Sequence, residues 1–264
     1  MKTVEKRIRE CREEGKIAFI PYIMAGDGGL ETLQEKLIFL EECGATAIEI
    51  GIPFSDPVAD GEVIQQAGER ALLNGVTLRK VLEKLEEVKG EVSVPLVIMT
   101  YLNPILAIGV ASFIKKCEDI GICGLIIPDL PIEENGLLYE QLQGTDIALI
   151  PLISLTSSHE RIADITANAE GFIYAVTVNG ITGVRNSFGS ELAEHLKRVK
   201  EVSPVPVLAG FGISTPQQVE QLGDHADGVI VGSAIVDAFH RKDLESIRGL
   251  LKASDRKFKN IAIP

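Results

Sequence analysis

The chain has 264 residues, of which 45% are hydrophobic and 24% are charged, so it is long enough to bury a large core. Its formal net charge of -12 argues against nucleic acid or an anionic membrane surface as a partner, because both would repel it. No apolar run is long enough to cross a membrane, and the charged stretch 1–16 does not resemble a signal peptide. The four cysteines show neither paired nor zinc-type spacing, so a cytoplasmic protein with reduced thiols and no metal site is expected.

The first predicted element is a helix over residues 1–14, and short apolar runs rich in β-branched residues follow it. Stretches with helical period, such as 30–44 and 78–90, separate these runs, and several of them end at glycine. Near-continuous apolar strands that alternate with helices are typical of a parallel sheet covered on both faces. The expected strands are residues 17–24, 46–50, 95–101, 124–128, 147–151, 171–178, 205–210 and 228–232.

Eight strand–helix repeats of this length fit a closed (β/α)8 TIM barrel of the α/β class better than an open sheet. No break in composition and no linker divides the chain, so residues 1–264 are expected to form one domain. Residues 255–264 are expected to be a surface tail that carries no chemistry.

In such barrels the active site is built at the carboxyl ends of the strands, from the loops that lead into the helices. This rule selects polar side chains after the first four strands and glycine-rich loops after the last three. The side chains are Tyr22, Asp27, Glu49, Asp60, Tyr101, Asn103 and Asp129.

Glu49 lies between Ile48 and Ile50 in a predicted buried strand, where an unpaired carboxylate is costly. Burial raises the pKa of a carboxyl group, which suits general acid–base catalysis near neutral pH. The alternative is that Glu49 caps loop N–H groups or pairs with a distant arginine. Asp60 follows nearby and is a second candidate, with an N-cap role for the next helix as its alternative. Two carboxylates in unlike environments can divide acid and base roles.

The glycine-rich segments 209–214 and 231–235 each place glycine at a strand end, next to the start of a helix. Backbone N–H groups there favour a phosphate group, and the loops after strands 7 and 8 are a frequent phosphate site in barrels. The alternative is that these glycines only form tight turns. The predicted phosphate-binding residues are Gly183, Val184, Gly212, Gly232 and Ser233.

The strand ends also restrict the chemistry by what they lack. They carry no lysine for a Schiff base, since Lys16 precedes the first strand, and no histidines or clustered acids for a metal. Carboxylates alone can cleave a carbon–carbon bond only if the substrate carries its own electron sink.

Six motifs resemble, in order and spacing, the tryptophan synthase alpha chain family. They are AIEIGIPFSDPVADG (47–61), MTYLNPI (99–105), IIPDLPIEE (126–134), ITGVR (181–185), GFGIS (210–214) and DGVIVGSAIV (227–236). The resemblance implies a TIM barrel that cleaves indole-3-glycerol phosphate to indole and glyceraldehyde 3-phosphate, with the indole ring as the electron sink. It also implies that Glu49 and Asp60 are the catalytic pair, with Glu49 moving protons and Asp60 stabilising charge at the ring nitrogen.

Other roles follow from the same resemblance. It places Thr182 in a lid that bonds the Asp60 carboxylate, whereas aromatic side chains at the pocket positions could equally be core filling. The implied indole pocket consists of Tyr22, Tyr174 and Phe211. Met24, Gly28 and Asn179 depart from the usual family pattern, and Asn179 bears on the motion of the lid.

The family works in an alpha2-beta2 complex with a beta chain that carries pyridoxal phosphate, so this chain is expected to hold no cofactor itself. Exposed proline and apolar side chains on the loops after strands 2, 3 and 4, Ile105 among them, would suit a docking face for that partner. The expected interface residues are Pro53, Asp56, Asn103 and Pro131. A stand-alone indole-3-glycerol phosphate lyase, another phosphate-sugar barrel enzyme and a non-catalytic barrel that activates a partner remain as alternatives.

Overall fold

A computed structural model of the chain describes residues 1–177, 190–210 and 212–255. Within these ranges the strands are β1 (Ala18–Met24), β2 (Ile48–Gly51), β3 (Leu96–Met99), β4 (Ile122–Ile126), β5 (Ala148–Leu149), β6 (Leu152–Ser154), β7 (Ile173–Val176), β8 (Val207–Gly210) and β9 (Gly228–Val231). The helices are α1 (Thr3–Glu13), α2 (Leu33–Glu42), α3 (Glu62–Leu73), α4 (Leu78–Glu87), α5 (Leu102–Ile108), α6 (Val110–Ile120), α7 (Gly136–Leu142), α8 (His159–Thr166), α9 (Ser190–Val202), α10 (Pro216–Gly223), α11 (Ser233–His240) and α12 (Leu244–Lys252).

The strands are parallel and follow the order β5-β4-β3-β2-β1-β9-β8-β7-β6. The two ends of this order, β5 and β6, are neighbouring pieces of one segment, separated only by Ile150 and Pro151. The Ile150 N–H donates to the Leu125 carbonyl at 2.9 Å, and the Pro151 carbonyl accepts from the Tyr174 N–H at 3.0 Å. This segment therefore pairs with β4 on one side and β7 on the other, and the sheet closes into a barrel.

The predicted (β/α)8 barrel is confirmed, with one difference in its fifth strand. The run expected at 147–151 is divided into β5 and β6 and extends to Ser154. Pro151 lies at the division, where it has no N–H to donate to a neighbouring strand. The segment changes partner at this point.

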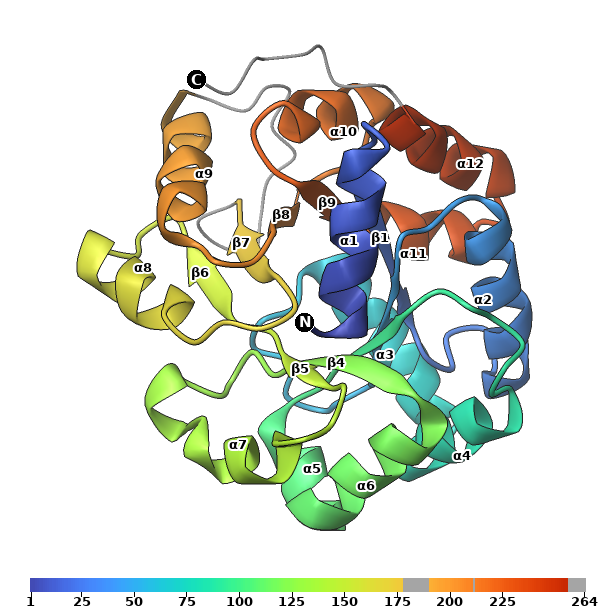
Figure 1. The fold of residues 1–264 in the computed structure, drawn as a ribbon. Coiled ribbons are helices and arrows are strands. Elements are labelled where there is room, and N and C mark those ends of the chain that lie inside the picture. The colour runs from blue at the N-terminus through green and yellow to red at the C-terminus, as the bar shows by residue number, and fades with distance from the viewer. Residues whose placement is uncertain (178–189, 211, 256–264) are drawn as a thin grey trace.

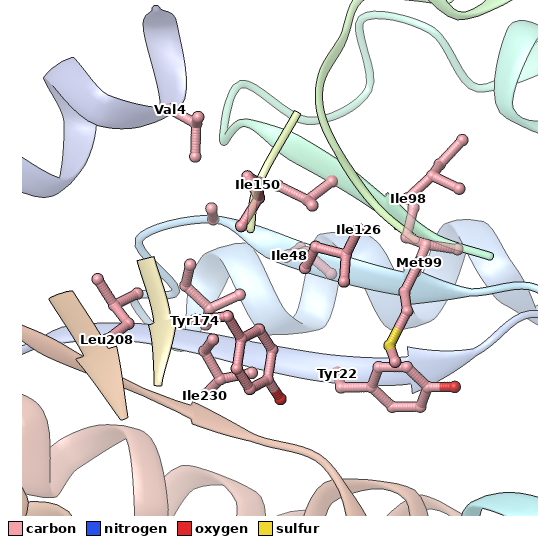
Figure 2. Packing of buried hydrophobic residues seen from close by; sticks show 14 of the residues in the cluster. Val4, Tyr22, Ile48, Ile98, Met99, Ile126, Ile150, Tyr174, Leu208 and Ile230 are labelled. Carbon is pink, nitrogen blue, oxygen red and sulfur yellow. The ribbon is translucent and has the colours of Figure 1, made fainter. Parts of the chain in front are cut away.

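The barrel core explains why the strands are nearly continuous apolar runs. All seven residues of β1 are buried, because the barrel interior lies on one side of the strand and helices cover the other. The covering helices bury one stripe each, such as Leu33, Leu37 and Leu40 on α2. Burying each such leucine contributes about 1.5–3 kcal/mol to folding. Figure 2 shows part of this core.

The amino-terminal helix predicted over residues 1–14 is present as α1, and it covers one end of the barrel. Val4 and Ile8 on α1 are fully buried, and Figure 1 shows α1 lying across the strands at the centre of the ring of helices. A Cβ atom built on Gly171, which precedes β7, would lie 3.3 Å from Val4. The carboxyl ends of the strands are therefore at the opposite end, which α1 leaves open for a site.

None of the helices in the described ranges combines the length and the apolar character that a membrane span requires.

Candidate active site

Glu49 is completely buried at the centre of β2, and its position is fixed by both neighbouring strands. It pairs in register with Tyr22 on β1 and with Val97 on β3. Among the described residues, neither carboxyl oxygen of Glu49 has a hydrogen-bond partner. The arginine-paired and loop-capping alternatives thus find no support in the described part of the chain. Burial, and then the charge of Asp60, raises the pKa of Glu49 to about 8.

Asp60 lies at the end of the loop that joins β2 to α3, and its side chain is 8% exposed. The N-cap residue of α3 is Gly61, and it makes no side-chain capping hydrogen bond. The N-cap alternative for Asp60 is therefore wrong, and its carboxylate is directed to other partners. Burial raises the pKa of Asp60 to about 6, while a hydrogen bond from the Tyr101 hydroxyl acts in the opposite direction.

The two carboxyl groups therefore differ in protonation at neutral pH. Asp60 loses its proton first, at a pH where Glu49 is still neutral, and its charge then raises the pKa of Glu49. Near pH 7 Asp60 is a carboxylate that can accept a hydrogen bond or stabilise positive charge, whereas Glu49 is an acid that can donate a proton. The family resemblance implied this division of roles, and the difference in pKa is consistent with it.

Tyr22 and Tyr174 are buried beside this pair, and each ring lies over a glycine. A Cβ atom on Gly51 would overlap the Tyr22 hydroxyl, and one on Gly210 would overlap the Tyr174 ring. Burial raises the pKa of both tyrosines, and the charges of Asp60 and Glu49 raise it further. In Figure 2 both hydroxyl groups lie on the side of the barrel core away from Val4. The two rings are thus placed where an apolar ring of a substrate could lie next to the carboxyl groups.

The start of α11, where the sequence predicted phosphate-binding residues, lies on the same side of the barrel. Gly232 is the N-cap residue and makes no side-chain capping hydrogen bond, and Ser233 begins the helix and is exposed. The first N–H groups of a helix have no partner within it, and they favour a phosphate group. A Cβ atom on Gly232 would lie 3.7 Å from the Tyr22 Cβ, so the start of this helix adjoins the Tyr22 ring.

The second predicted helix start, after β8, is different from the expectation. The Thr215 side chain caps α10, and the Gln218 side chain accepts hydrogen bonds from the N–H groups of Ser214 at 2.8 Å and Thr215 at 3.1 Å. Because these N–H groups are already satisfied, the predicted phosphate site at this helix start depends on Gly212. Gly212 stays a candidate through its backbone, which adopts a positive φ of 74°.

Several predicted site residues lie outside the residues that the structure describes. They are Phe211 of the indole pocket, Thr182 of the lid, Gly183 and Val184 of the phosphate site, and the departure at Asn179.

The rim of this end of the barrel carries the expected partner-facing residues in two different environments. Asp56, Asn103 and Pro131 are exposed, as expected for an interface. Pro53 and Ile105 are buried, so the expectation that they are exposed is wrong, and Ile105 of α5 is part of the hydrophobic core. On the loop between β2 and α3 the exposed apolar residue is Val58, which is 72% exposed, and on α5 it is Leu106, which is 49% exposed.

Two other acids at the strand ends have structural partners. Asp27 makes a two-point ion pair with Arg70, with N–O distances of 2.7 and 2.8 Å, which ties the loop after β1 to α3. Asp129 accepts the Leu102 N–H at 2.9 Å and so fixes the start of α5. Neither side chain is available as a catalytic acid in this arrangement.

No group of histidine, cysteine and acidic residues suited to a metal ion was found in the described ranges.

The sequence identified Tyr101 as a residue at a strand end but gave it no role. Its contacts with Phe54, Ala59 and Asp60 depend on how the loop after β2 folds over β3, which no local pattern encodes.

Comparisons with known proteins agree with this geometry. A family model described as the tryptophan synthase alpha chain matches residues 8–262. The tryptophan synthase alpha chain of Bacillus cereus (strain AH820) is 51% identical over 252 residues, which cover 96% of this chain and 98% of that protein. A protein of the same description from Bacillus anthracis is also 51% identical over the same length.

Solved structures give the same result at the level of the fold. A tryptophan synthase structure from Mycobacterium tuberculosis superposes with a TM-score of 0.88 at 34% identity and covers 96% of this chain and 98% of that one. The alpha subunit of tryptophan synthase from Legionella pneumophila superposes with a TM-score of 0.85 at 34% identity and covers 97% and 99%. With a family model that spans most of the chain and relatives at 51% identity, this chain belongs to the tryptophan synthase alpha chain family.

Proposed function

We propose that this chain is a cytoplasmic carbon–carbon lyase that cleaves indole-3-glycerol phosphate to indole and glyceraldehyde 3-phosphate. The observation that carries the proposal is the pair of buried carboxyl groups with separated pKa values, about 8 for Glu49 and about 6 for Asp60. This pair supplies an acid and a carboxylate at neutral pH, as a retro-aldol step on an indole ring requires.

The reaction begins with the proton of Glu49. Glu49 donates this proton to C3 of the indole ring, and Asp60 accepts a hydrogen bond from the ring N–H and stabilises the positive charge that develops there. The Glu49 carboxylate then takes the proton from the adjacent glycerol hydroxyl. The bond between C3 and the glycerol carbon breaks, its electron pair neutralises the ring, and the hydroxyl carbon becomes the aldehyde. Glu49 ends the cycle protonated, so the protons balance.

Binding of the substrate is divided between backbone and aromatic groups. Gly212, Gly232 and Ser233 would hold the phosphate, with Gly183 and Val184 from the loop after β7. The indole ring would lie among Tyr22, Tyr174 and Phe211, and Thr182 would close over Asp60. The close approach of Gly232 to Tyr22 supports this arrangement, because the substrate has its phosphate and its ring at opposite ends of a short glycerol chain.

The expected partner is a tryptophan synthase beta chain, which would carry the pyridoxal phosphate and receive the indole. Because both proton transfers above use Glu49 and Asp60 stabilises the charge, the proposed step in this chain needs no cofactor. Asp56, Asn103 and Pro131 are exposed at the same end of the barrel as the carboxyl pair and would form the interface. Pro53 would act there by shaping the loop, since its side chain is buried.

A coupled assay tests the proposal. Purified chain is given indole-3-glycerol phosphate, and glyceraldehyde 3-phosphate is followed through its oxidation by an added dehydrogenase, with and without a beta chain. We expect slow release of product by the chain alone and a faster rate with the partner. No product under either condition would refute the proposal, and full activity without stimulation would favour a stand-alone lyase.

A further inference from the structure

Tyr101 has no assigned role, yet it contacts both ends of the loop that carries Asp60. Its ring stacks on Phe54, with ring centroids 5.0 Å apart and an interplanar angle of 27°. Its hydroxyl oxygen accepts the Ala59 N–H at 3.0 Å, and the hydroxyl proton is donated to the Asp60 carboxylate. The side chain is buried, at 3% exposure, so water does not compete well for these bonds.

The position of Tyr101 is itself fixed from the next strand. Tyr101 precedes α5, and the first residue of that helix, Leu102, donates its N–H to the Asp129 carboxylate at distances of 2.9 and 3.2 Å. Asp129 follows β4, so three successive strands contribute to one arrangement. The backbone of β3 thus holds the tyrosine, and the tyrosine holds the loop.

We propose that Tyr101 is the positioning residue for Asp60, which it aims at the ring nitrogen of the substrate through the hydroxyl–carboxylate bond and the Ala59 anchor. This inference rests on the proposed function, because it assumes that Asp60 stabilises charge on an indole ring. Tyr101 acts through Asp60 and does not touch the reacting atoms.

The same contacts link the active site to the rim. The loop from Phe54 to Asp60 includes the exposed Asp56, so a partner that moves this loop also moves the two anchors of Tyr101. A displacement of a catalytic group by about 1 Å can cost on the order of 100-fold in rate. Tyr101 therefore determines how accurately the Asp60 carboxylate is positioned before any partner binds.

Loss of the Tyr101 hydroxyl is also expected to change the pH dependence of activity. The charged or titratable groups that act on Tyr101 are Asp60 and Asp129, and Tyr22 is also close to it. Because the Tyr101 hydroxyl lowers the pKa of Asp60, its removal raises that pKa above about 6. The acid limb of the pH profile of kcat/KM then moves to higher pH.

The test is Tyr101→Phe, which keeps the ring and its stack on Phe54 but removes the hydroxyl. We expect kcat for indole-3-glycerol phosphate to fall about 10-fold or more, with KM changed far less, and the acid limb to move upward. Tyr139→Phe on α7 is the matched control, because Tyr139 is 44% exposed and remote from the site. An unchanged kcat and acid limb in Tyr101→Phe would overturn the inference.

A double-mutant cycle with Asp60→Ala shows whether Tyr101 acts through Asp60. We expect Tyr101→Phe to have little further effect once the carboxylate is absent, whereas a full independent loss would contradict the positioning role. The wild type and Asp60→Ala alone are measured first, so an inactive wild type counts against the proposed function and not against Tyr101.

If Tyr101→Phe has a much lower Tm than the wild type, Phe54→Leu is the second variant, because it loosens the same ring with the hydroxyl kept. It is expected to lower kcat by a smaller factor, and no change there would also contradict the inference.

Discussion

The charge of Asp60 raises the pKa of Glu49, but the reverse effect does not operate, because Asp60 titrates while Glu49 is still neutral. Both groups are buried, at 8% exposure for Asp60 and 0% for Glu49, so each starts with a raised pKa. The order of titration then separates them. One buried pair in this way supplies a proton donor and a carboxylate at the same pH.

The buried Glu49 is expected to make folding stability fall as the pH rises. Its pKa is raised from 4.5 to about 8, so the folded state holds a proton that the unfolded state releases. The free energy of unfolding linked to this proton is at its maximum below pH 4.5. It falls progressively between pH 4.5 and pH 8, at a slope of about 1.4 kcal/mol per pH unit. We expect Glu49→Gln to have a higher Tm than wild type at pH 8 by about 4 °C or more.

This gain should be small below pH 4.5, where wild-type Glu49 is protonated in both the folded and the unfolded state. Thermal melts of both proteins across this range are the measurement. Equal Tm values at every pH would show that Glu49 ionises freely in the folded protein, against its burial and its lack of described hydrogen-bond partners.

Glu49→Gln is also expected to lower turnover of indole-3-glycerol phosphate by at least ~100-fold, the usual scale for a lost general acid–base group. Asp60→Asn is expected to lower turnover strongly as well. Because Asp60 does not cap α3 and its buried carboxyl group has a raised pKa, this second change should not lower thermal stability at neutral pH. Turnover of Glu49→Gln within a few-fold of wild type would mean that the glutamate is structural. If Asp60→Asn lowers the Tm markedly but lowers turnover only slightly, Asp60 mainly supports its loop.

Gly232→Val is expected to weaken binding of the phosphate substrate while binding of indole is largely kept. The φ of Gly232 is negative, at -101°, and an added Cβ atom meets only ordinary contacts with Tyr22. The valine would instead occupy the approach of the phosphate. Gly249→Val is the control, since a Cβ on Gly249 meets nothing within 4 Å. Equal loss of both ligands in Gly232→Val would count against the phosphate site.

Asp56→Ala is expected to reduce stimulation by a beta chain without changing the slow activity of the chain alone. Asp56 is exposed on the loop that ends at Asp60, and its carboxylate accepts only the neighbouring Ser55 hydroxyl among the described residues. Asp224→Ala is the control, because Asp224 is exposed just before β9, at the opposite end of the barrel. Turnover is titrated with beta chain for each variant. Undiminished stimulation of Asp56→Ala would place the interface elsewhere.

The barrel and its carboxyl pair could be predicted because local patterns encode them. Apolar runs of strand length alternate with helical stripes, and the strand-end rule places Glu49 and Asp60 together. The cap of α10 is local, because Gln218 lies only three and four residues from Thr215 and Ser214, and the Thr-x-x-Gln pattern could have indicated it. The division at Pro151 depends instead on hydrogen bonds to distant strands. The same is true of Tyr101, whose three contacts form only when the loop after β2 lies over the end of β3. Single-residue patterns hold no such information.

The most direct test of the central claim is the pH dependence of kcat/KM for cleavage of indole-3-glycerol phosphate by the wild-type chain. Asp60 must be ionised and Glu49 must be protonated, so the account predicts a bell-shaped profile with limbs near pH 6 and pH 8. The acid limb should disappear in Asp60→Asn, where no carboxylate titrates. A wild-type profile that is flat between pH 5 and 9, or an acid limb that persists in Asp60→Asn, would contradict the assignment of these two residues.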